Sequence, residues 1–171
     1  STLPAEESFT LEYVKNQPWS GYNWYKGNYT SLIQVNTDLP VGISRALDLA
    51  CHEGYPGHHT YNALLEKNLV RDRGWVEYTV YPLNSPQSLI AEGTGNFGLE
   101  IAFPGDERMK FDRDVLFPLA GLDPAEAELS GIEGSRGNDE RPERVREGNP
   151  FDVAEAVHSV GSCDGEVDVA S

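Results

Sequence analysis

The fold of this chain is decided by the stretch His52-Glu53-Gly54-Tyr55-Pro56-Gly57-His58-His59. Apolar residues recur at helical spacing just before it, and they predict a helix from about residue 42 into Glu53. Pro56 cannot donate the helical hydrogen bond to the carbonyl of residue 52, and Gly57 tolerates unusual backbone angles. We therefore expect the helix to bulge or break at 54–57, with a second helix at about 59–72.

The histidines of this stretch have an unusual spacing for a metal site. Where two histidines stand four residues apart on a helix, both imidazoles reach one zinc ion, and a glutamate beside the first is placed to act as a base. Here the position four residues after His52 is a proline. In an unbroken helix His58 would point about 240° round from His52, and His59 would lie ~10 Å further along the axis. Zinc–nitrogen bonds of about 2.0–2.1 Å tolerate neither arrangement. A break that absorbs two residues returns His58 to the second ligand position, and His59 is the alternative.

A catalytic zinc ion needs a third protein ligand and a fourth position open to water. Glu92 is the best candidate, on a helix that begins at Ser85-Pro86 with a capping hydroxyl and a proline in the first turn. Glycines surround it, at positions Gly93, Gly95 and Gly98. Each costs a helix roughly 1 kcal/mol relative to alanine, a cost that is kept where another backbone approaches closely. Glu100, two turns further on, is the reserve ligand.

The remaining elements follow from shorter patterns. We expect a helix at 5–16, a strand at 29–36, and a strand or extended segment at 75–82. The aromatic, turn-rich stretch 19–28 resembles a carbohydrate-binding surface, but rings at this density more often pack into cores and loops. Asp123-Pro124 is a further candidate helix start. Together the patterns predict an α+β fold that is mostly helical.

Charge and aromatic content divide the chain of 171 residues and net charge −15. Residues 121–171 hold 13 Asp and Glu against 4 Lys and Arg, and only one of the 17 aromatic residues. We expect a folded region at 1–125 and an acidic tail at 126–171 with doubtful order. The charge disfavours nucleic-acid and anionic membrane partners, because both need clustered Lys and Arg.

The sequence gives few indications of compartment. No apolar stretch has the length of a membrane span, and the first residues lack the basic and hydrophobic regions of a secretory signal. Cys51 and Cys163 lie in very different settings and give no disulfide framework, so a reducing compartment such as the cytoplasm is favoured.

Two motifs, His52 through His59 and Ala91-Glu92-Gly93, resemble those of a large uncharacterised domain family with the signature His-Glu-x-Tyr-Pro-Gly-His-His. The resemblance covers about residues 17–125. Its members look like zinc-dependent peptidases of the gluzincin kind, mostly helical, with a downstream Glu-Gly helix. The resemblance implies that His52, His58 and Glu92 bind zinc and that Glu53 is the catalytic base. It also implies a zincin-like active-site core, and we expect the chain to be a fragment of a larger helical domain.

The function that these observations favour is a zinc-dependent hydrolase that cleaves peptide bonds with a metal-activated water. The same chemistry would serve a small non-peptide amide or ester, and a non-catalytic metal-binding relative is the second alternative. Tyr55, Tyr78 and Tyr81 are candidates for stabilising an oxyanion, and the strand at 29–36 is a candidate edge for aligning substrate. Oligomeric state is left open.

Overall fold

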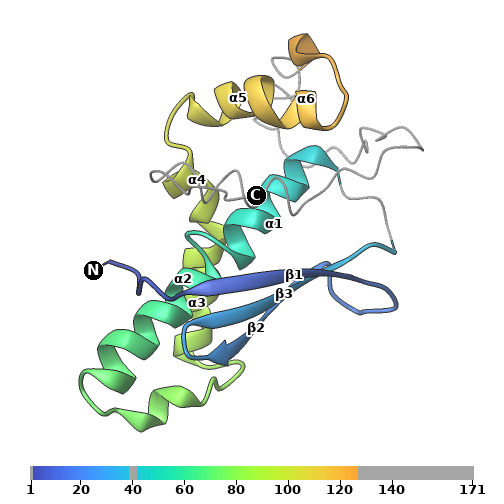
Figure 1. Cartoon of the computed structure of the whole chain (residues 1–171). Helices are drawn as coiled ribbons and strands as arrows, with labels where there is room; N and C mark the ends of the chain where they lie inside the picture. Colours follow the sequence, from blue (N-terminus) through green and yellow to red (C-terminus); the bar gives the residue numbers. More distant parts are fainter. Residues whose placement is uncertain (1, 39–41, 127–171) are drawn as a thin grey trace.

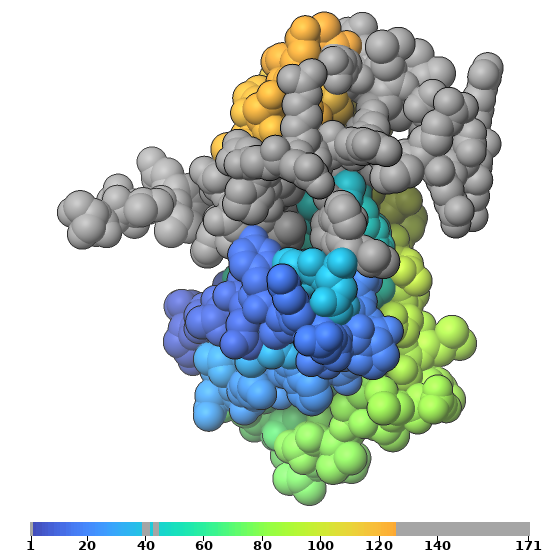
Figure 2. Space-filling model, turned by 90° about the vertical axis from the view of Figure 1, so that its right-hand side faces the viewer, coloured from blue at the N-terminus to red at the C-terminus, as the bar shows by residue number. Residues whose placement is uncertain are grey.

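The computed structural model describes residues 2–38 and 42–126 of the chain. The described part is an α+β fold, with about half of its residues in helices and a small three-stranded sheet (Figure 1). The sheet lies in the middle of the molecule, while α5 and α6 lie at one end and α2 runs toward the other (Figures 1 and 2). The acidic segment after residue 126 lies outside the described residues.

The sheet consists of β1 (Ser8–Val14), β2 (Gly21–Gly27) and β3 (Thr30–Asn36). Its order is β1-β3-β2, with β1 parallel and β2 antiparallel to β3. The strand predicted at 29–36 is confirmed. However, β3 is the middle strand, so the expectation that it offers an edge to substrate is wrong. The edge strands are β1 and β2, and β2 forms within the stretch that was interpreted as turn-rich.

The helix predicted at 5–16 is wrong, because the residues there alternate with a period of two. Phe9 and Leu11 turn toward the core and pack beside Val35 and the first helix, while Thr10 and Glu12 face solvent. β1 pairs with β3 over its whole length, so one side of its backbone is hydrogen bonded within the sheet.

Helix α1 (Ile43–Glu53) is the central element and confirms the helix predicted before the motif. One face, Ala46 and Ala50, packs on Val35 of the sheet. The adjacent face, about 100° round the helix, packs into the larger core cluster, whose members are Leu47, Cys51, Leu99, Phe103, Leu116, Phe117 and Ala120. A helix that is buried on two sides is held in place by both layers, so its last turn is a firm base for a site.

The chain breaks after Glu53 and resumes at His58 with α2 (His58–Leu65), as the sequence predicted. The Tyr55–Pro56 peptide bond between them is cis. Gly57 has a φ of −77°, so it does not need the left-handed region. It needs space, because a Cβ there would lie 1.9 Å from the carbonyl oxygen of His52.

Beyond α2 the helix continues as a π-helical segment, Glu66–Arg71, and Gly74 follows with a φ of +70°. The helical extent predicted for 59–72 is therefore confirmed. The strand or extended segment predicted at 75–82 is wrong for residues 76–79, which form a short 3₁₀ helix, Val76–Thr79, while Val80 after it is extended. The alternating residues there have no layer to pack against, since Val76 and Val80 are 68% and 67% exposed.

The second half of the fold is made of short helices. Helix α3 (Pro86–Asn96) begins where the sequence predicted, with the Ser85 hydroxyl accepting a hydrogen bond from the backbone N–H of Ser88. The chain then forms five further elements: α4 (Gly98–Ala102), α5 (Glu107–Phe111), a π-helical turn (Asp112–Leu116), α6 (Phe117–Leu119) and a 3₁₀ turn (Pro124–Glu126). Among the described residues, none of the helices combines the length and apolarity needed to cross a membrane.

A glycine pair tests how α4 packs on α1. A Cβ at Gly98 would lie 2.9 Å from the carbonyl oxygen of Cys51, whereas a Cβ at Gly93 would meet nothing within 4 Å. We predict that Gly98→Ala lowers the free energy of unfolding by about 1–3 kcal/mol, because overpacking forces the two helices apart. Gly93→Ala is the matched control and should raise it by up to roughly 1 kcal/mol. Urea unfolding of both variants measures this, and equal midpoints would contradict the proposed close packing.

Candidate metal centre

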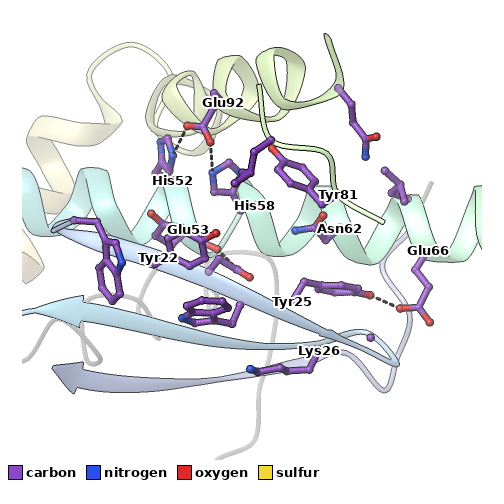
Figure 3. A pocket seen from close by; sticks show the side chains of 18 of the residues that line it. Tyr22, Tyr25, Lys26, His52, Glu53, His58, Asn62, Glu66, Tyr81 and Glu92 are labelled. Carbon is purple, nitrogen blue, oxygen red and sulfur yellow. Dashed lines mark hydrogen bonds and ion pairs between the residues drawn. The ribbon is translucent and has the colours of Figure 1, made fainter. Parts of the chain in front are cut away.

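Three predicted ligands meet at one point in the structure. His52 lies in the last turn of α1, His58 is the first residue of α2, and Glu92 lies on α3. One ligand atom from each lies within 4.8 Å of the others. Figure 3 shows the Glu92 carboxylate on one side of the two imidazoles, joined to both by dashed lines.

The ligand atoms of the three side chains lie close to one another. The Nε2 atom of His52 lies 3.4 Å from one carboxylate oxygen of Glu92, and the Nε2 atom of His58 lies 3.3 Å from the other. Two atoms bound at about 2.0–2.1 Å to one tetrahedral ion are roughly 3.3–3.4 Å apart. Each of the two separations is of this size, and they involve different oxygens of Glu92. The two rings stand nearly perpendicular, with centroids 4.6 Å apart, so they approach the common point from different directions.

The three side chains differ in exposure. The His52 and His58 side chains are 15% and 14% exposed, whereas that of Glu92 is 53% exposed. Burial is the main reason that the pKa of each imidazole lies below its usual value, although the nearby Glu92 carboxylate acts in the opposite direction. A neutral imidazole keeps the lone pair that a metal ion needs.

Helix α3 approaches His52 at a glycine. A Cβ at Gly95 would lie 3.0–3.2 Å from three atoms of the His52 ring. The sequence-based expectation that another backbone approaches these glycines is confirmed at Gly98, beside the backbone of Cys51, whereas the close neighbour of Gly95 is the His52 side chain. It is wrong for Gly93, which faces open space.

The alternative ligands lie elsewhere. His59 is fully buried, and its two ring nitrogens are hydrogen bonded to Ser31 and Glu7. Glu100 is exposed on α4 and is not part of the group. The structure thus brings His58 and Glu92, not His59 and Glu100, beside His52.

Glu53 lies beneath the imidazoles, on the side away from Glu92 (Figure 3). It is 6% exposed, and its Oε2 atom has no hydrogen-bond partner among the described residues. Burial, followed by repulsion from Glu92, raises the pKa of its carboxyl group to about 7. Asn23 on β2 donates a hydrogen bond of 2.7 Å to the Glu53 backbone carbonyl and fixes the end of α1 against the sheet. A buried carboxyl group with a free oxygen, beside three side chains that could hold a metal ion, is suited to proton transfer.

The group opens into a cavity of about 1140 Å³ between β2 and the helices that follow the motif. His52, Glu53, His58 and Glu92 all line it. At the far end the Tyr25 hydroxyl donates a hydrogen bond of 2.5 Å to Glu66, so the sheet and the π-helical segment are tied together there.

The three candidate tyrosines differ in their contacts and in whether they line the cavity. Tyr55 donates its hydroxyl to Glu7 and is not among the described residues that line the cavity. Tyr78 lines it but stacks on Trp75. Tyr81 also lines it, and its hydroxyl donates a hydrogen bond of 3.2 Å to Ser88, one turn before Glu92 on α3.

Sequence reasoning did not find Asn23 or Glu7 as parts of this region. Both act across long separations, 30 residues from Asn23 to Glu53 and 52 from Glu7 to His59, and no local pattern signals such pairs.

Comparisons of the chain with models of protein families, with curated proteins and with solved structures find no match. What the group does is therefore inferred from its own geometry.

We predict that the protein binds one zinc ion per chain and that Glu92→Ala weakens this binding strongly, because it removes one of three ligands. Glu100→Ala is the matched control, an exposed glutamate on the next helix, and should bind as the parent does. Titration of metal-free protein, followed calorimetrically and by elemental analysis, measures both. Parent-like zinc affinity in Glu92→Ala would show that the third ligand is misassigned.

A second prediction concerns the ring of His52. Gly95→Ala should displace the imidazole by a few tenths of an ångström, since the new Cβ meets three of its atoms. Metal sites tolerate only about ±0.2 Å, and changes to supporting residues typically weaken affinity about 10–100-fold. Gly93→Ala, on the same helix, should leave zinc affinity unchanged. The idea fails if the two variants bind zinc equally well with the same far-UV spectrum.

Proposed function

We propose that this chain is a zinc-dependent hydrolase that cleaves peptide bonds, with His52, His58 and Glu92 as metal ligands and Glu53 as the catalytic base. One observation carries the proposal: three ligand-type side chains converge at the wall of a large cavity, beside a buried carboxyl group with an unpartnered oxygen. The resemblance of the 52–59 and 91–93 motifs leads to the same assignment. A zincin-like core is part of this proposal.

The donor set favours zinc. Two imidazoles and one carboxylate are a common ligand set of catalytic zinc sites, whereas calcium and magnesium prefer oxygen ligands alone. When bound, the ion would polarise a carbonyl group and lower the pKa of a coordinated water.

Glu53 is proposed to accept the proton of the attacking water and to return it to the leaving amine. Its position supports this role, because it lines the cavity on the side of the imidazoles opposite Glu92. Gly21 lets β2 lie close to the end of α1, since a Cβ there would lie 2.7 Å from Cδ2 of Leu49 and 3.3 Å from Oε1 of Glu53.

Tyr81 is the residue proposed to stabilise an oxyanion. It is the one candidate tyrosine whose ring lines the cavity without stacking on Trp75 and whose hydroxyl is held by the helix that carries Glu92. The Tyr81 hydroxyl has a single proton, so it would donate to a developing charge only when the Ser88 hydroxyl donates to it in turn, and both hydroxyls can take either role.

The shape of the cavity favours a peptide over a small amide or ester. Its volume of about 1140 Å³ exceeds the roughly 300–1,000 Å³ of typical small-molecule sites. The edge strand β2 also lines it, which offers unpaired backbone groups to an extended substrate.

The base is tested by Glu53→Gln, which keeps the shape and a hydrogen-bonding group but cannot accept the proton. We predict that this variant binds zinc as the parent does, while hydrolysis of a fluorogenic peptide library falls by at least about 10²-fold. Glu100→Gln is the control and should retain full activity.

Two results would count against the mechanism. Unchanged turnover in zinc-loaded Glu53→Gln would exclude Glu53 as the base. A parent that binds zinc stoichiometrically but hydrolyses neither peptides nor small amides and esters would favour the non-catalytic alternative.

A further inference from the structure

His59, the histidine that does not join the metal-binding group, is the centre of a buried polar cluster. Its Nε2 atom lies 2.5 Å from an oxygen of Glu7, and its Nδ1 atom lies 2.8 Å from the Ser31 hydroxyl. The Tyr55 hydroxyl donates to both Glu7 oxygens, at 2.7 and 2.6 Å. Phe9 lies against the Tyr55 and His59 rings, with centroids 5.3 and 5.4 Å away. We name these four polar residues, Glu7, Ser31, Tyr55 and His59, the Glu7 cluster.

The order of groups, serine to histidine to carboxylate, matches the hydrogen bonding of a nucleophilic triad. The burial of Ser31 and His59 excludes a role in nucleophilic catalysis. Ser31 is 4% exposed and His59 is 0% exposed, and neither is among the described residues that line the cavity. No substrate reaches the serine oxygen, so the Glu7 cluster acts on structure and not on a bond.

We propose that Glu7 is a positioning residue of the metal centre, which acts through His59 and Tyr55 to set the place of His58. The proposal rests on the metal centre proposed above. Its basis is the position of the two partners: Tyr55 lies in the break between α1 and α2, and His59 is the neighbour of His58 in the first turn of α2. One carboxylate is therefore hydrogen bonded to side chains that lie before and after His58 in the chain.

Because His58 and His59 are neighbours in one helix, the bonds that hold the His59 ring also limit the movement of the His58 ring. Neighbouring side chains point about 100° apart, so His59 faces the sheet while His58 faces the cavity. A histidine Nε2 lies roughly 6–7 Å from the helix axis, because Cα is about 2.3 Å from it and the side chain adds the rest. Rotation of α2 by about 10° would move the Nε2 atom of His58 by about 1 Å, far beyond the ±0.2 Å or so that a metal site tolerates.

The bonds of the Glu7 cluster oppose that rotation. With Nε2–H donated to the carboxylate, Nδ1 of His59 accepts from the Ser31 hydroxyl, so the ring is held at both nitrogens. Loss of the carboxylate would leave the His59 ring and the Tyr55 hydroxyl with unmet hydrogen bonds in a buried place, which is costly. Glu7 itself is held by β1, which begins at the next residue and pairs with β3.

The test uses zinc and cobalt(II) as probes on the whole chain. Glu7→Ala should weaken zinc binding by about 10–100-fold and shift the visible absorption of the cobalt-loaded protein, because the ligand geometry changes. Glu7→Gln should bind zinc nearly as the parent does, since the amide oxygen accepts from both donors. Glu6→Ala, at the exposed neighbouring glutamate, should match the parent in affinity and spectrum.

Tyr55→Phe keeps the ring and removes only the hydroxyl, so it tests the proposal even if Glu7→Ala does not fold. It should weaken zinc binding by about tenfold and shift the cobalt spectrum. Parent-like affinity and spectrum in folded Glu7→Ala, or in Tyr55→Phe, would overturn the positioning role alone. A parent that binds neither metal stoichiometrically would overturn the metal centre and this role with it.

Discussion

The arrangement of the site depends on one steric constraint, the return of the chain at Gly57 onto the end of α1. The backbone there lies so close to His52 that a Cβ would stand 1.9 Å from its carbonyl oxygen. This contact lets the next helix begin beside the last turn of the first. It brings the His58 ring within 4.6 Å of the His52 ring, measured between centroids, and turns His59 into the core. An uninterrupted helix would separate these side chains.

The layers around the break keep it in place. Helix α1 is packed on the sheet through Ala46 and Ala50 and on the helical core through Leu47 and Cys51. Helix α3 comes close through Gly95, and so brings Glu92 within reach of both imidazoles. The sheet, the break and the helices therefore all help to place His52, His58 and Glu92 beside one another.

The sequence was most informative where the determinants are local. Pro56 and Gly57 predicted the break, the Ser85 cap predicted the start of α3, and β-branched residues predicted β3. It failed at β1, where too few apolar residues distinguish a period of two from helical spacing and where pairing with β3 decides the outcome. The hydrogen-bond partners of His59 could not be predicted from the sequence either, since Glu7 lies 52 residues and Ser31 lies 28 residues away along the chain. Histidine spacing alone left His58 and His59 as alternatives, and the direction of each side chain depends on tertiary contacts.

The central claim, that His52, His58 and Glu92 together hold one metal ion, is tested most directly by a crystal structure of the zinc-loaded protein with diffraction data collected on both sides of the zinc absorption edge. The account predicts one anomalous peak per chain, within about 2.0–2.2 Å of Nε2 of His52, Nε2 of His58 and a carboxylate oxygen of Glu92. A peak beside His59 and Glu7, or zinc bound only at scattered surface carboxylates, would contradict it.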